Sequence, residues 1–256
     1  ITSIQTDGIN PFHQKPEEID VIVKDPNLVK IAAQTYDVFF YGAGCNYDDK
    51  QQIVKDSLKK VFVFADITVD HDLLAAARGV CGHEMGITCI LGTGSNSCLY
   101  DGENIYKNSP SLGYILGDEG SGTYMGKKLL RDYLYNNLPK SLHTKFEEQY
   151  QLTIDIILNN VYRNYLPNKF LASFFEFIYA NIKHPYMYGL VYESFYDFLD
   201  RHVIKYDNYK SVPTHFVGSI AFYYKDILAK VADDLELILG NVIETPAEGL
   251  IKYHER

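Results

Sequence analysis

Long apolar runs are missing from this 256-residue sequence, and none approaches the roughly 18 to 20 apolar residues that a membrane span requires. Residues 1–30 also lack the charged start and apolar stretch of a secretory signal peptide. These two absences predict a cytoplasmic protein without a membrane partner. Apolar content, at 46%, is ordinary for a globular chain that builds real cores.

Positive charge is also scarce. Lys and Arg number 24 against 33 Asp and Glu residues, which gives a formal net charge of -9, and no basic stripe interleaved with aromatic residues occurs. Such a stripe is the usual footprint of nucleic-acid binding, so we expect no nucleic-acid partner. An acidic chain can still hold a nucleotide, because bound divalent metal and local backbone dipoles do so, rather than global charge.

Cysteine is sparse, and no Cys-x-x-Cys pair occurs. Cys45, Cys81, Cys89 and Cys98 stand on or beside apparent strands and turns, so we expect reduced, buried thiols. The eight histidines are scattered, without a His-x3-His motif or a cluster of His with carboxylates. We therefore expect no metal site built from protein ligands such as a zinc site.

Strand-like and helix-like patterns alternate over the first third of the chain. Short apolar runs predict four strands, over residues 1–6, 38–41, 61–65 and 86–91. The segments between them predict crossover helices, over residues 16–33, 48–60 and from Leu73 onward. Strands that alternate with helices indicate an α/β fold whose ligands collect at the strand ends.

The second half of the chain is helical from Gly122 to about Asp207, with breaks at Pro139, Pro167 and Pro185. Two short strands and a last helix complete the pattern, over residues 214–217, near 235–239 and from Pro246. Most of the aromatic residues fall in this helical half and are expected to form core or interface. The aromatic-rich helices could supply the face of a homodimer.

Three clusters of glycine and hydroxyl residues follow or precede these elements. The first, Gly92-Thr-Gly-Ser-Asn-Ser97, lies between two strands, the second of which turns back at Asp101-Gly102. Another, Gly117-Asp-Glu-Gly-Ser121, precedes a helix, and Gly218-Ser219 leads from a strand into a helix. Glycine lets the backbone approach a ligand, hydroxyls donate hydrogen bonds, and helix N-termini favour anions. These clusters therefore predict phosphate binding.

The clusters are not familiar nucleotide motifs. A Walker loop needs Gly five residues before its Gly-Lys pair and Ser or Thr after it, but Gly126-Lys127 has Ser121 before it and Lys128 after it. A dinucleotide fingerprint needs a third Gly where Ser97 stands, and a helix where a strand follows. The predicted phosphate loop therefore joins two antiparallel strands.

These junctions, in this order, resemble the N-acetylglucosamine kinases and their relatives, the BadF-type activator ATPases, within the sugar kinase, heat-shock-protein and actin superfamily. The matching segments span the chain, over residues 6–12, 41–44, 71–78, 91–97, 113–121, 216–221 and 246–249. The resemblance implies an α/β actin-like ATPase fold of ribonuclease-H-like topology, with two lobes, a helix-rich second lobe and ATP in the interlobe cleft. It predicts the lobes over residues 1–84 plus 245–256 and over 85–244.

The resemblance also implies roles for individual residues. It places the nucleotide against the second phosphate loop and the adenosine turn, at Gly92, Thr93, Gly94, Ser95, Asn96, Gly218 and Ser219. It places the sugar against Asn10, Gly42, Ala43, Ser111, Gly113 and Asp118, with Glu119 supporting Asp118. Asp72 matches the catalytic aspartate, which would accept the sugar hydroxyl proton as its oxygen attacks the γ-phosphoryl group.

Plainer roles stand beside these. On the residues alone, Asp72 is an ordinary helix N-cap before an apolar, Ala-rich segment. Asp70 competes with it as the base, and Asn10 before Pro11 is a normal turn former. Asp118 could equally cap the helix that begins near Ser121.

The activity that the resemblance implies is ATP-dependent phosphorylation of an amino sugar, with N-acetylglucosamine converted to its 6-phosphate and Mg²⁺ accompanying the ATP. Two alternatives stay open: an activator ATPase that drives a partner enzyme, and a sugar-binding relative without catalysis. Family activators hold an iron-sulfur cluster between subunits through paired cysteines, and the cysteine spacing here does not match that arrangement. N-acetylmuramate, glucosamine and glucose stay open as acceptors.

Family members begin with a strand ending in Asp-x-Gly-x-Thr-Lys-Thr, whose Asp organises magnesium. This sequence starts at what matches the third strand. We expect further residues before Ile1, because a sheet without its two leading strands would expose a long edge and lose core.

Overall fold

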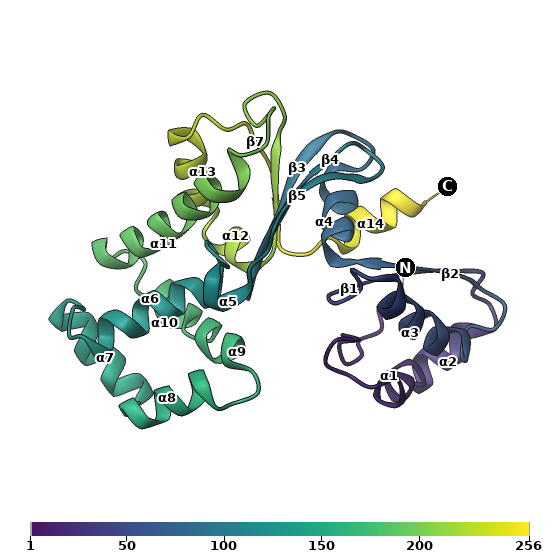
Figure 1. The fold of residues 1–256 in the computed structure, drawn as a ribbon, viewed down its shortest axis with the longest axis horizontal. Coiled ribbons are helices and arrows are strands. Elements are labelled where there is room, and N and C mark those ends of the chain that lie inside the picture. The colour runs from purple at the N-terminus through teal and green to yellow at the C-terminus, as the bar shows by residue number, and fades with distance from the viewer. Residues whose placement is uncertain (1, 256) are drawn as a thin grey trace. The chain divides into compact units, whose positions relative to one another are not determined.

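The computed structural model describes residues 2–255, which form two compact units that divide between Ala75 and Ala76. We call them unit 1 and unit 2, and Figure 1 colours the chain along its length. Both units combine strands with helices, as the predicted α/β class requires. The lobe boundaries given above stay a prediction, and their end residues, Ile1 and Arg256, lie outside the described part.

Unit 1 is built on a pair of parallel strands. Its elements are α1 (Pro16–Val23), α2 (Pro26–Ala32), β1 (Asp37–Gly42), α3 (Asp48–Lys59) and β2 (Asp66–His71), followed by the start of α4 (Asp72–Cys81). β1 and β2 pair from Asp37 opposite Asp66 to Gly42 opposite His71. The helix expected over residues 16–33 is two helices, because Pro26 cannot continue α1 and Asp25 caps α2 through the Asn27 N–H.

Apolar side chains of α1, α3 and β2 form the core of unit 1, including Ile19, Val54, Ile67 and Val69. Alternate burial of Ile67 and Val69 along β2 is the pattern of a half-buried strand.

Two expected strands of unit 1 are wrong. Residues 61–65 continue from α3, since the Phe62 N–H donates to the Leu58 carbonyl, and Val63 and Phe64 are 58% and 77% exposed. The strand begins only at Asp66. Residues 2–6 form no strand either.

Unit 2 contains a mixed sheet and most of the helices. Its strands are β3 (Gly86–Leu91), β4 (Ser95–Tyr100), β5 (Ile105–Ser109), β6 (Thr214–Val217) and β7 (Leu239–Ile243). Its helices are α5 (Gly113–Leu116), α6 (Gly122–Leu134), α7 (Lys140–Tyr150), α8 (Ile154–Tyr162), α9 (Pro167–Ala172), α10 (Phe175–Ala180), α11 (Pro185–Phe198), the π-helix η1 (Leu199–Val203), α12 (Ser219–Tyr223), α13 (Lys225–Asp234) and α14 (Ala247–His254). The helix-rich second part is confirmed.

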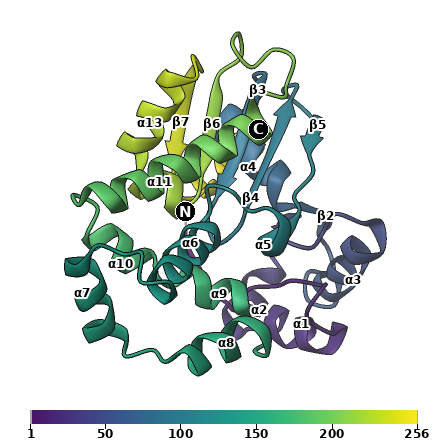
Figure 2. The same cartoon turned by 60° about the vertical axis from the view of Figure 1, so that its left-hand side comes forward.

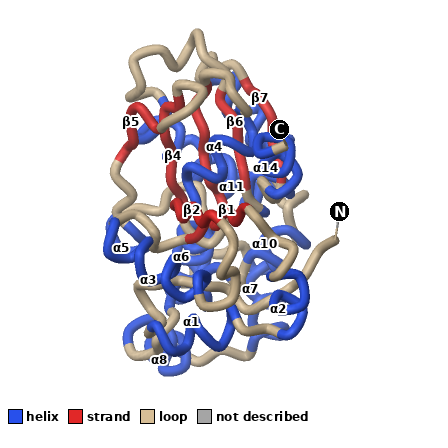
Figure 3. The backbone as a smooth tube through the Cα atoms, turned by 90° about the vertical axis from the view of Figure 1, so that its right-hand side faces the viewer, coloured by secondary structure: helices blue, strands red, loops and turns tan. Residues whose placement is uncertain are grey.

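The sheet of unit 2 has the order β5-β4-β3-β6-β7, with β3 antiparallel to β4 and parallel to β6. Helices α12 and α13 pack on β6 and β7 on one side, where α11 also lies (Figures 1 and 2). The last turns of α4, together with α14, lie over the other face (Figure 3). The hairpin predicted around Asp101-Gly102 is confirmed as β4 and β5, whereas the last strand begins at Leu239, later than expected.

The three prolines at which breaks were predicted stand at helix starts. Pro139 is the N-cap of α7, and Pro167 and Pro185 are the first residues of α9 and α11. Aromatic residues form much of the core of unit 2, as expected. Phe146 is fully buried and its ring centroid lies 5.5 Å from Phe174 and 5.1 Å from Phe177. Such tilted and edge contacts add stability beyond the buried area.

The four cysteines are buried and free, which confirms their predicted state. Within residues 2–255, no helix combines the length and apolarity needed to cross a membrane.

The crossing of α6 and α9 predicts a large stability effect. An added Cβ at Gly126 would lie 1.9 Å from the Leu171 carbonyl oxygen, so Gly126→Ala must push the two helices apart. We expect a loss of about 3 kcal/mol in the free energy of unfolding, measured by urea titration. Gly189→Ala in α11 is the matched control, because its Cβ would meet nothing within 4 Å, and it should gain about 0.5 to 1 kcal/mol. Equal effects of the two changes would contradict the packing described.

Candidate functional site

The turn between β3 and β4 is the first feature of the site. Leu91 pairs with Ser95 across it, and the Gly92 N–H donates to the Gly94 carbonyl over 3.0 Å. Thr93 is exposed at the tip, whereas Ser95 is buried and its Oγ finds no partner among the described residues. An added Cβ at Gly92 would meet no atom within 4 Å. The turn therefore combines open space with backbone that a ligand can approach.

The start of α6 is bonded to the same turn. The Gly122 N–H donates to the Gly92 carbonyl over 2.9 Å, and the Thr123 N–H and Oγ1 donate to the Thr93 carbonyl over 3.2 and 2.6 Å. The first two predicted clusters thus meet at the N-terminus of a 13-residue helix. The positive end of a helix dipole favours an anion at that place.

The Gly218-Ser219 turn lies against the end of β3. Gly218 has a φ of +121°, and an added Cβ would come within 2.3 Å of the Leu91 carbonyl oxygen and 3.3 Å of the Gly92 nitrogen. Only glycine permits this approach. Ser219 is exposed as the first residue of α12. All three glycine and hydroxyl clusters of unit 2 are therefore gathered at one end of its sheet.

Asp118 lies on the same turn. Its Oδ1 accepts from the Ser95 N–H over 3.3 Å, and both of its carboxylate oxygens would be 3.2 Å from a Cβ added to Gly94. Ser121, rather than Asp118, is the N-cap of α6. Burial raises the pKa of Asp118, and the Ser95 N–H and the Lys127 charge offset this only in part. Asp118 therefore is not the helix cap, and its buried carboxylate lies against the Gly94-Ser95 backbone.

The remaining predicted residues of unit 2 divide into two groups. Ser111 donates from its Oγ to the Ser95 carbonyl over 3.2 Å, and Gly113, with a φ of +70°, begins α5 with nothing within 4 Å of an added Cβ. Ser111 is thus bonded to the end of the turn, whereas Gly113 has open space beside it. The amide of Asn96 has another task, because its Oδ1 accepts from the next backbone N–H over 2.9 Å and from Asn108 Nδ2 over 3.1 Å. It ties β4 to β5.

The carboxyl ends of β1 and β2 hold the predicted residues of unit 1. Gly42 pairs with His71, so the Gly42-Ala43 turn and Asp72 follow neighbouring parallel strands at the same end. An added Cβ at Gly44 would lie 2.4 Å from Asn10 Oδ1, which places the Asn10 side chain against this turn. Asn10 Oδ1 also accepts a backbone N–H two residues on, so it forms the expected turn as well.

The N-cap bond of α4 comes from His71 rather than from Asp72, whose carboxylate accepts from its own N–H and from the Leu73 N–H. The Leu74 N–H donates to His71 Nδ1 over 3.3 Å, so His71 supplies this cap of α4. Burial raises the pKa of Asp72, and the charge of His71 lowers it only in part. Burial, followed by the nearby Asp72 and Asp70 carboxylates, raises the pKa of Cys45 to about 11. Cys45 is therefore an inert thiol beside a carboxylate pair.

Sequence reasoning missed the segment 198–206, which supports the loops of unit 2. The Tyr206 hydroxyl lies 2.9 Å from Ser97 Oγ and accepts from the Ser109 N–H over 3.0 Å. Ser109 Oγ donates to the His202 carbonyl over 3.1 Å. No local signal could have revealed these bonds, because Ser109 and Tyr206 are 97 positions apart.

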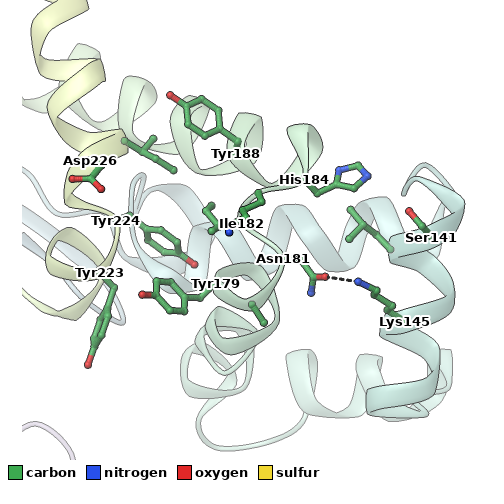
Figure 4. A pocket seen from close by; sticks show the side chains of 14 residues that line it. Ser141, Lys145, Tyr179, Asn181, Ile182, His184, Tyr188, Tyr223, Tyr224 and Asp226 are labelled. Carbon is green, nitrogen blue, oxygen red and sulfur yellow. Dashed lines mark hydrogen bonds between the residues drawn. The ribbon is translucent and has the colours of Figure 1, made fainter.

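A cavity of about 910 Å³ lies elsewhere in unit 2, among α7, α10, α11, α12 and α13 (Figure 4). Tyr179, Tyr223 and Tyr224 stand at one end of it, and Lys145, bonded to Asn181, stands at the other. None of the predicted site residues lines this cavity. It is distinct from the turns described above.

Known proteins resemble this chain in sequence and in fold. No family model matches the chain. A structure from Porphyromonas gingivalis, of a protein assigned as an N-acetylglucosamine kinase, is 44% identical, with a TM-score of 0.94 over 98% of this chain and 89% of that chain. A structure from Chromobacterium violaceum with the same assignment is 17% identical, with a TM-score of 0.64 over 82% of this chain and 73% of that chain. The second shows a shared fold.

The N-acetylmuramic acid/N-acetylglucosamine kinase of Clostridium acetobutylicum is 27% identical over 136 residues. The match spans 51% of this chain and 44% of that protein, so less than half of this relative's length is covered. The Porphyromonas gingivalis structure confirms the predicted family, and the Chromobacterium violaceum structure shares the α/β fold.

Proposed function

The chain belongs to the N-acetylglucosamine kinase family, and we propose that it transfers the γ-phosphoryl group of ATP to the 6-hydroxyl of N-acetylglucosamine. The observation that carries the proposal is the match to the Porphyromonas gingivalis protein, which extends over nearly the whole chain. The geometry of the two units supports it, because each unit gathers its predicted residues at the end of its sheet.

The nucleotide part of the proposal rests on unit 2. Phosphate oxygens would be held by the turn from Gly92 to Asn96, close to the positive end of the α6 dipole, and the adenosine would rest on Gly218-Ser219. The residues fit such a group, because space is open beside Gly92 and the buried Ser95 Oγ has no partner in the described chain. ATP supplies the phosphoryl group, and backbone dipoles aimed at it stabilise its charge.

Mg²⁺ is proposed from the chemistry of ATP, since kinases hold this ion largely through phosphate oxygens and one or two carboxylates. Residues 2–255 contain no group of three or more His, Cys, Asp or Glu side chains that could hold a metal. The described side chains alone therefore do not form a metal cage.

The sugar part of the proposal assigns Asp72 as the general base. Its carboxylate would accept the proton of the 6-hydroxyl while the oxygen attacks the γ-phosphorus. Asp118 would accept hydrogen bonds from ring hydroxyls, and Asn10, Gly42-Ala43, Ser111 and Gly113 would border the sugar. Binding would then orient the hydroxyl, and exclusion of water would protect the phosphoryl group from hydrolysis.

The burial of the cysteines weighs against the activator ATPase. Cys45, Cys81, Cys89 and Cys98 are each less than a tenth exposed, and burial raises the pKa of every one of these thiols. A cluster shared between subunits needs exposed thiolates. An inactive sugar binder would have no use for a base, and a carboxylate, Asp72, stands at the end of β2 where a base is expected.

A coupled assay of ADP release tests the proposed function. The full protein is incubated with ATP and Mg²⁺, alone and with N-acetylglucosamine, N-acetylmuramate, glucosamine or glucose. ADP release that depends on N-acetylglucosamine supports the kinase. ADP release without any sugar, or none with every hexosamine, would refute it.

The raised pKa of Asp72 predicts the acid side of the pH profile. A general base works only when ionised, so kcat/KM should fall about tenfold per pH unit below the pKa of this carboxyl. Because burial raises that pKa above its ordinary value of 3.8, the fall begins at a higher pH than for an exposed aspartate. Initial rates from pH 3 to 8 check this, and an acid limb centred at or below pH 3.8 would contradict it.

A further inference from the structure

The backbone of Asp118 is held in an unusual conformation. Its φ of +59° is in the left-handed region, which residues other than glycine adopt at a cost of about 1 to 3 kcal/mol. The next glycine, Gly120, also has a positive φ of +74°. Such a loop keeps its shape only when its surroundings enforce it. The neighbours of Asp118 therefore decide where its carboxylate lies.

Glu119 is the neighbour with the strongest contacts. Its side chain is 5% exposed, with Oε1 2.7 Å from Arg201 Nη1 and Oε2 3.3 Å from His202 Nε2. Burial alone would raise the pKa of Glu119, but its own backbone N–H, His202 and Arg201 together lower it. Each oxygen of the Glu119 carboxylate thus has its own partner, which fixes the orientation of the group and keeps it ionised.

Both partners of Glu119 come from the π-helix η1. Consecutive residues of an α-helix point about 100° apart. Arg201 and His202 are consecutive in η1, yet both of their side chains contact the Glu119 carboxylate. Short π-helical turns occur often at functional sites. The His202 ring also stacks on Phe198, with centroids 4.9 Å apart, and a Cβ added to Gly120 would lie 2.9 Å from Phe198 Cβ. The turn 198–202 therefore forms a wall against the loop 117–120.

Stability alone is a poor account of the Arg201 contact. The Arg201 side chain is 55% exposed, and a partly exposed ion pair contributes little to folding. Its position next to the Asp118 loop is what distinguishes it from other surface ion pairs. The Asp197 carboxylate and the Tyr124 hydroxyl also lie near Arg201, and the hydroxyl donates to the carboxylate over 2.7 Å.

We propose that Arg201 and His202 position Asp118 by holding Glu119, and that this clamp sets the affinity for the sugar. The inference deepens the proposed kinase function and rests on it. Arg201, His202 and Glu119 are positioning residues, which touch Asp118's loop rather than the sugar. A clamp of this kind supplies the second layer of contacts that keeps a binding carboxylate in place.

Kinetics of four variants test the clamp. Arg201→Ala should raise KM for N-acetylglucosamine and lower kcat/KM by roughly 10- to 100-fold, because a displaced binding group loses orientation. KM for ATP should not change. Arg201→Lys should recover part of the loss, since an ammonium group still pairs with the carboxylate. Glu119→Ala should act like Arg201→Ala, and the double variant should be no worse than Glu119→Ala alone.

The matched control is Arg163→Ala at the end of α8, where the guanidinium bonds only to the neutral Asn159 side chain among the described partners. It should leave both KM values unchanged. Hydrogen exchange of residues 117–121 gives a readout that needs no activity, and Arg201→Ala should exchange faster there but not in α8.

The outcomes separate the two claims. A parent protein that phosphorylates no sugar sinks the proposed function, and exchange in the Asp118 loop then still decides the clamp. The clamp would be overturned if the losses in kcat/KM of Arg201→Ala and Glu119→Ala multiplied in the double variant. An unchanged KM for the sugar in Arg201→Ala would also overturn it, as would equal hydrogen exchange of residues 117–121 in the parent and in Arg201→Ala.

Discussion

Asp72→Asn is expected to lower kcat for sugar phosphorylation by roughly 10²- to 10⁴-fold, with little change in KM for either substrate. The amide keeps the shape of the carboxylate but cannot accept the hydroxyl proton. Asp70→Asn is the matched comparison, because Asp70 lies inside β2 opposite Tyr41 and Asp72 follows the strand. It should retain most of the activity. The coupled ADP assay measures both.

The same substitution should make the protein more stable at neutral pH. Burial raises the folded-state pKa of Asp72, so the folded chain holds its proton more tightly than the unfolded chain does. The stability from this group is therefore full below the unfolded pKa and is lost as pH rises through the raised pKa. Asp72→Asn cannot ionise, so its Tm at pH 7 should exceed that of the parent. Full activity in Asp72→Asn, or inactivity in Asp70→Asn alone, would refute the assignment of the base.

Gly218→Ala is expected to damage the nucleotide site and the fold together. The added Cβ would lie 2.3 Å from the Leu91 carbonyl oxygen, at a φ of +121° that alanine rarely adopts. The β6–α12 turn must then move away from Leu91 and Gly92. We expect a loss of about 3 kcal/mol in stability, from strain and overpacking together, and a KM for ATP raised roughly 10²-fold.

Gly82→Ala separates the two causes. Gly82 also has a positive φ, of +60°, but its added Cβ would meet nothing within 4 Å. This control should lose only the strain, about 1 kcal/mol, and keep its KM for ATP. Urea unfolding and ATP titration of the two variants provide the comparison. Equal losses in both would show that the approach of Gly218 to Leu91 does not matter.

The elements with strong local signals could be predicted from the sequence. Proline cannot continue a helix, so Pro167 and Pro185 mark the starts of α9 and α11. The turn from Gly92 to Ser95 was predicted between two strands, and it is found between β3 and β4. The resemblance to the kinase family rested on the order of several motifs along the chain, because no single motif was specific enough to show it.

Other features could not be predicted, because distant contacts decide them. Residues 61–65 alternate Val and Phe like a strand, yet Phe64 is exposed where the chain leaves α3. The capping of α4 by His71 depends on how β2 ends. The contact of Arg201 with Glu119 joins residues 82 positions apart. Local propensity carries no information about such pairs.

The most direct test of the account is ³¹P NMR of the full protein with ATP, Mg²⁺ and N-acetylglucosamine. The account predicts that the γ-phosphate signal of ATP is replaced by one phosphomonoester, coupled to the protons on C6 of the sugar. Inorganic phosphate as the sole new signal besides those of ADP, with the sugar unchanged, would contradict it.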